Sequence, residues 1–402
     1  MWIHKLKNRL QHTPFLLRLF ISGHFISRLG DSLYSFAVPW ISYELTGSAL
    51  VMGSLYAVSV LPVVLFGPFV GVYVDRWDRK KLMIGIDLAR MVLVALLPVL
   101  HTFDLLTLGW LYATGFTLSL LTMAYEVSIV AITPDLASGD LTQANSGIQT
   151  VNQLADMLGP AFAGGLTAIL GAINILWLDV LSFGLVLFML TQLPANRKSK
   201  RIMTNVFKEM KDGLHWLTQH SVNLALSIQA AVGNFGYSAA YSVLTYYLIT
   251  VFHLNSNQVG INYSLLAAGG VIGSIGIVAL DKRYARGKLI TSLLIVGFIG
   301  FMFAALCPVW FAPGIGFAIV GACNVGWSII TASIRQETVP AHLLGRVLSF
   351  SRVITRTAMP AGALLGGLLS GTLHPATVFL LAAFAKLIEV VIAYLSPIRK
   401  LI

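Results

Sequence analysis

Long apolar segments alternate with short polar ones along the whole chain. A helix rises about 1.5 Å per residue, so about 20 apolar residues cross the hydrocarbon core of a bilayer. Because open strands cannot satisfy their backbone groups in lipid, each long apolar segment predicts a helix. The ends of these segments are marked by clusters of charged residues or of Pro, Gly and Asn. The sequence therefore predicts twelve spans, at 17–44, 48–74, 81–101, 105–132, 143–170, 173–193, 222–251, 258–280, 287–308, 313–335, 343–371 and 375–396.

The composition agrees with this pattern. Of the 402 residues, 57% are hydrophobic and 11% are charged, whereas a soluble domain carries about 25% charged residues. The chain is therefore predicted to be an integral membrane protein that is embedded in a lipid bilayer. A net charge of +11 would suggest a nucleic-acid partner for a soluble protein. Here the positive-inside rule accounts for the charge, and we expect no nucleic-acid partner.

The basic residues predict the orientation in the membrane. One set of alternate loops carries the Lys and Arg that lie between spans, and it comprises the N-terminus, 75–81, 133–142, 194–221, 281–288, 336–346 and the C-terminus. The other set carries neither residue and lies around 45–47, 102–104, 171–172, 252–257, 309–312 and 372–374. Since basic loops face the cytoplasm, we expect a multi-pass protein of the plasma (inner) membrane with both termini cytoplasmic.

The chain repeats itself after six spans. Similar sequence segments recur about 200 to 206 residues apart. The pairs of similar segments are Gly71 to Arg76 with Gly276 to Arg283, Thr133-Pro134 with Val339-Pro340, and Gly159 to Gly165 with Pro360 to Gly367. Two related six-span halves are typical of secondary transporters. We therefore predict a first half at 1–193, a cytoplasmic linker at 194–221 and a second half at 222–402.

The loop between the second and third spans carries a recognisable motif. Gly71-x-x-x-Asp75-Arg76-x-x-Arg79-Lys80 resembles the signature loop of the major facilitator superfamily, with Asp78 where that signature usually has Gly. Further segments resemble its drug:proton antiporter branch, which contains macrolide efflux proteins and the enterobactin exporter, and they are Leu29 to Ser32, Ala37 to Trp40 and Leu45 to Ser48. The resemblance implies an all-α membrane protein with twelve transmembrane helices in two pseudo-symmetric six-helix halves.

Polar residues form stripes on four of the predicted helices, the first, fourth, seventh and tenth, and the fifth and eleventh also qualify. The resemblance implies that the same four helices line a central cavity. From the seventh and tenth helices we expect substrate-cavity residues, namely Asn234, Tyr237, Tyr241, Asn324 and Trp327. Their aromatic rings would suit a bulky lipophilic substrate. The alternative is that these aromatic residues only pack or anchor the helices.

Charged residues inside a bilayer are costly, so each acid in a span is a candidate for proton coupling. Asp31 in the first span is the leading candidate, because desolvation would bring it into a range where it can bind and release protons. The alternative is a structural pair with Arg28, one helical turn away. Asp156 in the fifth span either titrates or pairs with Arg352 or Arg356.

A third candidate, Glu126 in the fourth span, either titrates or, as the resemblance implies, clasps Arg79 of the signature loop. Three further charged groups are expected to have structural roles. They are Asp179 and the pairs Asp87–Arg90 and Lys386–Glu389.

The signature loop is also predicted to act as a conformational latch. Its members are Gly71, Asp75, Arg76, Arg79 and Arg346. Small residues let helices approach closely, and Asp75 can accept hydrogen bonds at a helix N-terminus. The resemblance places that N-terminus near residue 343. The alternative is that the basic residues only set the topology.

Motifs of other protein classes are missing from the sequence. It has no phosphate-binding Gly-x-x-x-x-Gly-Lys-Ser/Thr loop and no Cys/His cluster with metal-ligand spacing. We therefore expect no cofactor, no metal and no enzymatic activity. The predicted function is efflux of an amphipathic small molecule (a drug, a macrolide-like compound or a siderophore) in exchange for protons, by a monomer. The alternatives are a facilitator or importer of a small solute, and a lipid flippase or membrane sensor.

Overall fold

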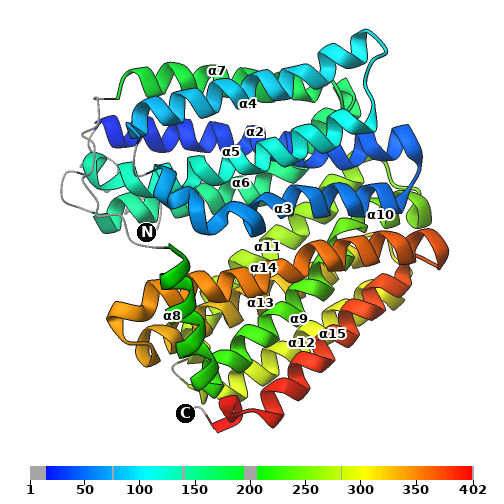
Figure 1. The fold of residues 1–402 in the computed structure, drawn as a ribbon. Helices are drawn as coiled ribbons and strands as arrows, with labels where there is room; N and C mark the ends of the chain where they lie inside the picture. The colour runs from blue at the N-terminus through cyan, green and yellow to red at the C-terminus, as the bar shows by residue number, and fades with distance from the viewer. Residues whose placement is uncertain (1–14, 75–76, 138–140, 194–205, 282, 401–402) are drawn as a thin grey trace, which may run out of the picture. The chain divides into compact units, whose positions relative to one another are not determined.

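The computed structural model describes residues 15–74, 77–137, 141–193, 206–281 and 283–400, and these residues form helices joined by short turns (Figure 1). The helices are α2 (Phe15–Thr46), α3 (Ala49–Val74), α4 (Arg79–Thr102), α5 (Leu108–Leu136), α6 (Leu141–Leu170), α7 (Ile175–Thr191), α8 (Val206–Gln219), α9 (Ser221–Ser242), α10 (Leu244–Phe252), α11 (Ser256–Asp281), α12 (Arg286–Leu306), α13 (Ala312–Thr338), α14 (Ala341–Thr372) and α15 (Ala376–Leu395), followed by a short 3₁₀ turn, η1 (Pro397–Lys400). The predicted all-α membrane fold is confirmed.

Each of the twelve predicted spans coincides with a helix to within a few residues. The seventh differs in one respect, because it is interrupted at Val243 into α9 and α10. Within the described part of the chain, eight helices are long and apolar enough to cross a bilayer. The apolar helix α7 has 17 residues. Helices α2, α6 and α9 are not among these eight, and each contains polar residues, such as Ser27, Asn152 and Asn234.

The chain forms two compact units. The first comprises Met1–Val38 and Phe69–Met203, and the second comprises Pro39–Pro68 and Thr204–Ile402. In the first unit α4 packs along α7 and α5. In the second unit α13 packs between α11 and α12, while α9 packs on α14 and α15. The division into halves at 1–193 and 222–402, with a linker at 194–221, stays a prediction.

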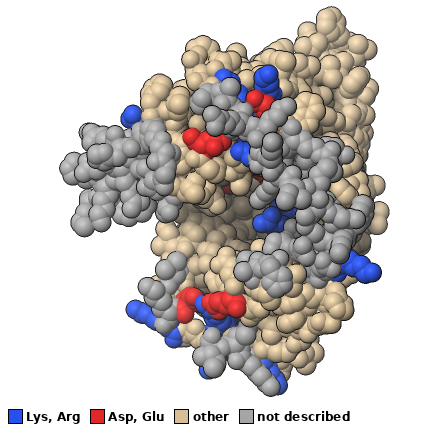
Figure 2. Space-filling model, turned by 60° about the vertical axis from the view of Figure 1, so that its left-hand side comes forward, with Lys and Arg blue, Asp and Glu red and all other residues tan. Residues whose placement is uncertain are grey.

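Apolar packing holds helices α2, α4, α5, α6 and α7 of the first unit together. Its core contains Phe20 of α2, Met83 of α4, Ile129 of α5 and Leu190 of α7. Many large apolar side chains lie on the outside instead, such as Phe188, which is 67% exposed. This is the pattern expected where lipid is the solvent. On the face in Figure 2, acidic and basic side chains lie beside each other in small groups on a largely uncharged surface.

Candidate functional site

A buried arginine contacts charged and aromatic side chains from four helices of the first unit. Arg90 on α4 is 2% exposed. Its Nη2 donates to Oδ1 of Asp31 on α2, and its Nη1 donates to Oδ1 of Asp87, 3.3 Å away and one turn earlier on α4. The guanidinium carbon also lies 4.6 Å from the ring centroid of Phe183 on α7 and 5.5 Å from that of Tyr125 on α5. The predicted Asp87–Arg90 pair is therefore confirmed, and Asp31 belongs to the same network.

A third acid, Asp179 on α7, lies beside this network and is fully buried. The Ser182 hydroxyl donates to its Oδ1 over 3.2 Å. The carboxyl interacts electrostatically with Asp31, Arg90 and Asp87. A Cβ atom added at Gly30 on α2 would overlap both this oxygen and Ser182 Oγ, so the missing side chain makes room for the buried acid.

The alternative interpretation of Asp31, a pair with Arg28, differs from what the structure shows. Arg28 donates instead to Oδ1 of Asp156 on α6, at 2.9 Å. One turn earlier on the same two helices, Nε2 of His24 lies 2.8 Å from Oδ1 of Asn152. The polar stripes of α2 and α6 thus face each other, and Arg28 lies on a different side of α2 from Asp31. The partner of Asp156 in this structure is Arg28, and the roles of Arg352 and Arg356 stay predictions.

The expected clasp between Glu126 and Arg79 is also wrong. Arg79 Nη1 donates to the Ala131 carbonyl at 2.8 Å and lies 3.5 Å from Oδ2 of Asp135. The acid beside Arg79 is therefore one that follows Pro134, near the end of α5, whereas Glu126 is exposed. Titration of Glu126 stays a prediction.

Two further residues of the signature loop fix helix ends. Asp78, the departure from the usual glycine, caps α4 by accepting from the Lys81 backbone N–H at 3.0 Å. Lys80 donates to the carbonyls of Thr191, at 2.8 Å, and Leu193 at the end of α7. A cation there is favoured by the helix dipole. The remaining latch residues, Gly71, Asp75, Arg76 and Arg346, lie outside the described residues or side chains, so the latch stays a prediction.

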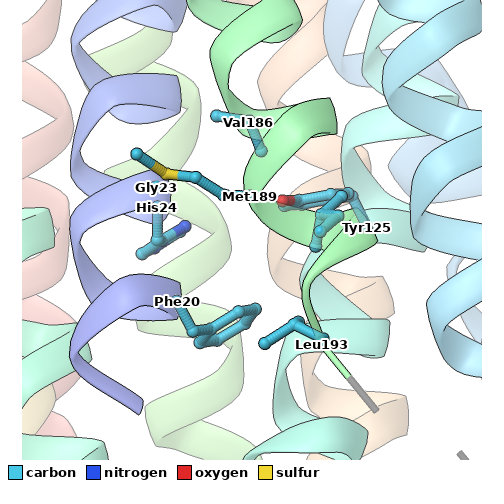
Figure 3. Close-up of a pocket in the computed structure, with 8 residues that line it drawn as sticks. Phe20, Gly23, His24, Tyr125, Val186, Met189 and Leu193 are labelled. Carbon is cyan, nitrogen blue, oxygen red and sulfur yellow. The ribbon is translucent and has the colours of Figure 1, made fainter. Parts of the chain in front are cut away.

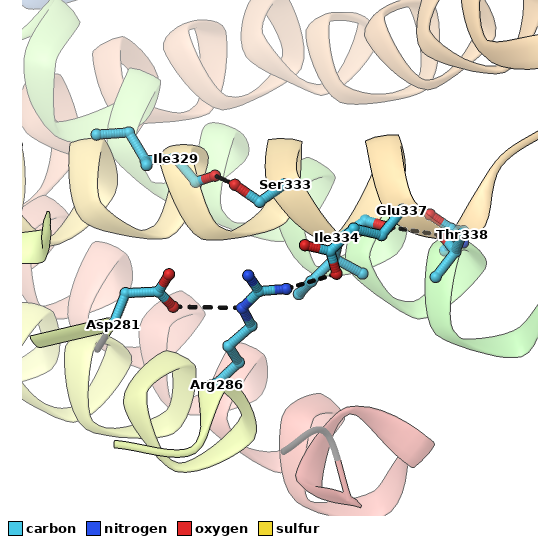
Figure 4. Close-up of polar contacts among 8 residues, drawn as sticks. Asp281, Arg286, Ile329, Ser333, Ile334, Glu337 and Thr338 are labelled. Carbon is cyan, nitrogen blue, oxygen red and sulfur yellow. Dashed lines mark hydrogen bonds and ion pairs between the residues drawn. The ribbon is translucent and has the colours of Figure 1, made fainter. Parts of the chain in front are cut away.

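The second unit contains a related group of charges where α11, α12 and α13 meet (Figure 4). Arg286 Nη1 lies 2.7 Å from Oε2 of Glu337, and its Nε lies 3.3 Å from Oδ1 of Asp281. Asp281 is the residue that echoes Asp75 in the repeat. The arginine thus joins the end of α11 and the end of α13 to the start of α12.

Aromatic side chains gather in the second unit around the predicted cavity residues. Tyr237 stacks on Tyr241 with ring centroids 5.7 Å apart. Tyr241 in turn meets Tyr56 of α3 at 5.5 Å and Tyr263 of α11 at 5.7 Å. Phe317 of α13 lies edge-on to Tyr237, also at 5.7 Å. The aromatic group therefore spans α3, α9, α11 and α13, and its contact with substrate stays a prediction.

The other three predicted cavity residues are engaged by their neighbours. Their bonds run from Asn234 Nδ2 to the Thr355 carbonyl (3.0 Å), from Trp327 Nε1 to Gln229 Oε1 (2.8 Å), and from Lys386 Nζ to Asn324 Oδ1 (2.9 Å). Lys386 also lies 2.9 Å from Oε1 of Glu389, with both side chains buried, so the predicted Lys386–Glu389 pair is confirmed. These bonds hold α9, α13, α14 and α15 in register.

A small pocket in the first unit adjoins the arginine network (Figure 3). It is lined by Phe20, Gly23, His24, Tyr125, Val186, Met189, Leu190 and Leu193. Its volume of about 10 Å³ is no larger than a single water needs, so it cannot hold a drug-sized molecule. The aromatic group of the second unit remains the better candidate for a substrate surface.

Sequence reasoning named Asp31 and Asp179 but connected neither of them to Arg90. It offered Arg28 as the alternative partner of Asp31, and it gave Asp179 a structural role without a partner. A signal was available in Arg90, because an arginine within an apolar run requires anionic partners. The sequence does not say which helices pack on α4, and that packing decides which acids reach the guanidinium.

Comparisons with known proteins agree along most of the chain. A family model described as Major Facilitator Superfamily matches residues 20–359. Macrolide efflux protein A of Streptococcus pyogenes is 26% identical over 389 residues, which cover 94% of this chain and 96% of that protein. Multidrug efflux pump Tap of Mycolicibacterium fortuitum is 25% identical over 406 residues, covering 96% and 97% of the two chains.

Solved structures match as well. A bacterial homologue of the iron transporter ferroportin in its inward-facing state gives a TM-score of 0.74 at 21% identity, covering 94% of this chain and 98% of the other. The nucleoside transporter NupG gives a TM-score of 0.72 at 12% identity, with 95% and 98% covered. At these identities the likeness shows the fold.

Proposed function

Because the chain belongs to the major facilitator superfamily, we propose that it exports an amphipathic small molecule in exchange for protons. The family predicted from the signature loop is confirmed, and the protein is a multi-pass membrane transporter rather than an enzyme. In the proposed cycle, two halves of the molecule rock about a central site and expose it to each side in turn.

The observation that carries the proposal of efflux is the relationship to two efflux proteins over nearly the full chain. Their names describe macrolide and multidrug efflux, so we assign a lipophilic substrate such as a drug, a macrolide-like compound or a siderophore. The stacked rings of Tyr237 and Tyr241 support this assignment, because such rings offer broad apolar faces with a polar edge. Asn234, Asn324 and Trp327 would complete the substrate surface.

Proton exchange is assigned to Asp31, Asp156 and Glu126. Asp31 and Asp156 each pair with an arginine on another segment, Arg90 and Arg28 respectively. An acid that gives up its arginine and takes a proton instead stays neutral in the bilayer. Asp156 is 53% exposed at its side chain, and Glu126 is exposed, so both are open to exchange.

The proposed orientation places both termini in the cytoplasm, because the basic loops all fall on one side. The proposed latch joins Gly71, Asp75, Arg76 and Arg79 to Arg346 at that side. It is supported by the contact of Arg79 with the end of α5, since a loop tied to a helix end must move with that helix.

Transport by the purified protein in lipid vesicles tests the proposal. Vesicles are loaded with a radiolabelled macrolide, and the outside is acidified to impose a pH gradient. We expect efflux to accelerate and to return to its basal rate when nigericin collapses the gradient. Asp31→Asn and Asp156→Asn should lose this acceleration but retain counterflow. The matched control is Asp104→Asn, which removes an exposed carboxyl from the turn after α4.

Three results would contradict the proposal, and each favours one alternative. Macrolide movement that ignores the pH gradient in the wild type would indicate a facilitator or importer. Movement of a fluorescent lipid across the bilayer without movement of the macrolide would indicate a flippase, and movement of neither would indicate a sensor.

A further inference from the structure

The arginine network of the first unit holds more negative than positive groups. Three carboxyls, those of Asp31, Asp87 and Asp179, share the single guanidinium of Arg90. Arg90 is 2% exposed, while Asp87 and Asp179 are fully buried. A buried charge without a partner is so costly that the group becomes neutral instead. The network is electrically neutral only when it holds two protons.

The neighbouring groups do not remove this excess. His24 interacts with Asp31 and Arg90, Tyr34 interacts with Asp179, and Tyr125 interacts with Asp87 and Arg90. Arg28, the other cation nearby, is held by Asp156. Even a positively charged His24 would leave one carboxylate in excess.

Among the residues that the structure describes, Asp179 has no cation of its own. Arg90 contacts Asp31 and Asp87 directly, whereas Asp179 accepts from the Ser182 hydroxyl through Oδ1. Within the described part of the chain, Oδ2 of Asp179 is buried and has no hydrogen-bond partner. A protonated carboxyl at this position carries no charge that needs compensation.

In the second unit, Glu389 corresponds to Asp179, but a neighbouring cation balances its charge. A Cβ atom at Gly233 on α9 would lie 2.7 Å from Oε1 of Glu389 on α15, just as Gly30 on α2 makes room for Asp179 on α7. Gly233 and Gly30 each lie on the first predicted span of a half, and the two acids lie on the sixth. Glu389 has its own cation, Lys386, 2.9 Å away. That pair is neutral without any bound proton.

We propose that Asp31, Asp87, Asp179 and Arg90 form one proton-binding cluster that holds two protons, one of them on Asp179, while Arg90 holds Asp31. This inference rests on the proposed proton exchange and extends it to Asp179 and Asp87. When Asp179 releases its proton to water, it becomes a carboxylate that competes with Asp31 for the guanidinium. Asp31, 23% exposed at its side chain, is the least buried acid of the cluster. Because Asp31 lies on α2 and Arg90 on α4, a change of partner at the guanidinium links proton release to the position of α2.

Infrared spectroscopy of the protein in lipid nanodiscs tests the inference without any substrate. Protonated carboxyls absorb in a region separate from carboxylates, and ¹³C-labelled aspartate shifts the band of every aspartic acid. We expect the wild type at neutral pH to show protonated aspartate. Asp179→Asn should remove the signal of one bound proton, and Asp87→Asn should do the same. The control Glu389→Gln should leave the labelled-aspartate band unchanged, because it removes a buried glutamate of the second unit that is not part of the cluster.

The outcomes separate this inference from the proposed function. A wild type without a protonated-aspartate band at neutral pH would overturn the inference, even if no variant folds. An unchanged band in folded Asp179→Asn would overturn it as well. If the band behaves as expected but no macrolide moves in vesicles, the proton site stands and the proposed function fails. If transport follows the pH gradient but the band does not respond to Asp179→Asn, only the inference fails.

Discussion

Substitution of Gly30 by alanine should destabilise the first unit, although alanine is the better helix former. The added Cβ would lie 3.0 Å from Ser182 Cβ and closer still to Ser182 Oγ and Asp179 Oδ1. Replacing glycine by alanine inside a helix is otherwise favourable by about 1 kcal/mol. Forcing an extra carbon into a packed interior costs about 1–3 kcal/mol, and here it also displaces a buried acid. The clash therefore outweighs the helix propensity.

Tryptophan fluorescence during thermal unfolding in detergent measures the effect. The matched control is Gly184→Ala on α7, where a Cβ atom would meet nothing within 4 Å. We expect Gly184→Ala to unfold at or slightly above the wild-type temperature and Gly30→Ala to unfold below it. Equal melting temperatures for the two variants would show that Gly30 does not make room for Asp179, and the described packing of α2 on α7 would be refuted.

Three further predictions concern the ion pairs and one buried hydrogen bond. Arg90→Gln should lower the melting temperature much more than Arg28→Gln. Removing one partner of a buried ion pair costs about 3–5 kcal/mol, whereas removing one partner of an exposed pair costs about 1 kcal/mol or less. Similar melting temperatures for the two variants would contradict this prediction. Trp327→Phe should cost about 1–3 kcal/mol, because it leaves the amide of the buried Gln229 without its hydrogen-bond donor, and an unchanged thermal transition would argue against that bond. Arg286→Gln should change stability by less than about 1 kcal/mol, because its partners are solvent-accessible; a large loss measured by the same fluorescence scan would show a hidden structural role.

The positions of the helices could be predicted because the length of an apolar run is set by the bilayer. The partners of the charges inside the helices could not. Arg28 and Asp31 are neighbours in sequence, yet they face different helices, and Asp31 finds Arg90 59 residues later. Glu126 and Asp135 were both available to Arg79, and only the way α4 meets the end of α5 selects Asp135. The pairs Asp87–Arg90 and Lys386–Glu389 were predicted correctly from their spacing of three residues. The same spacing did not join Arg28 to Asp31, because each of these two residues has a partner on another helix.

The distance in sequence between Asp31 and Arg90 has a consequence for biogenesis. Ribosomes add about 5–20 residues per second, so the aspartate leaves the ribosome roughly 3 to 12 seconds before the arginine 59 residues later. The first helix must therefore wait for its counter-ion beside the insertion machinery or enter the lipid with its acid protonated. Lys386 and Glu389 are made almost together and face no such delay. Depleting a membrane insertase or chaperone should thus impair assembly of the amino-terminal helices before that of the carboxy-terminal ones.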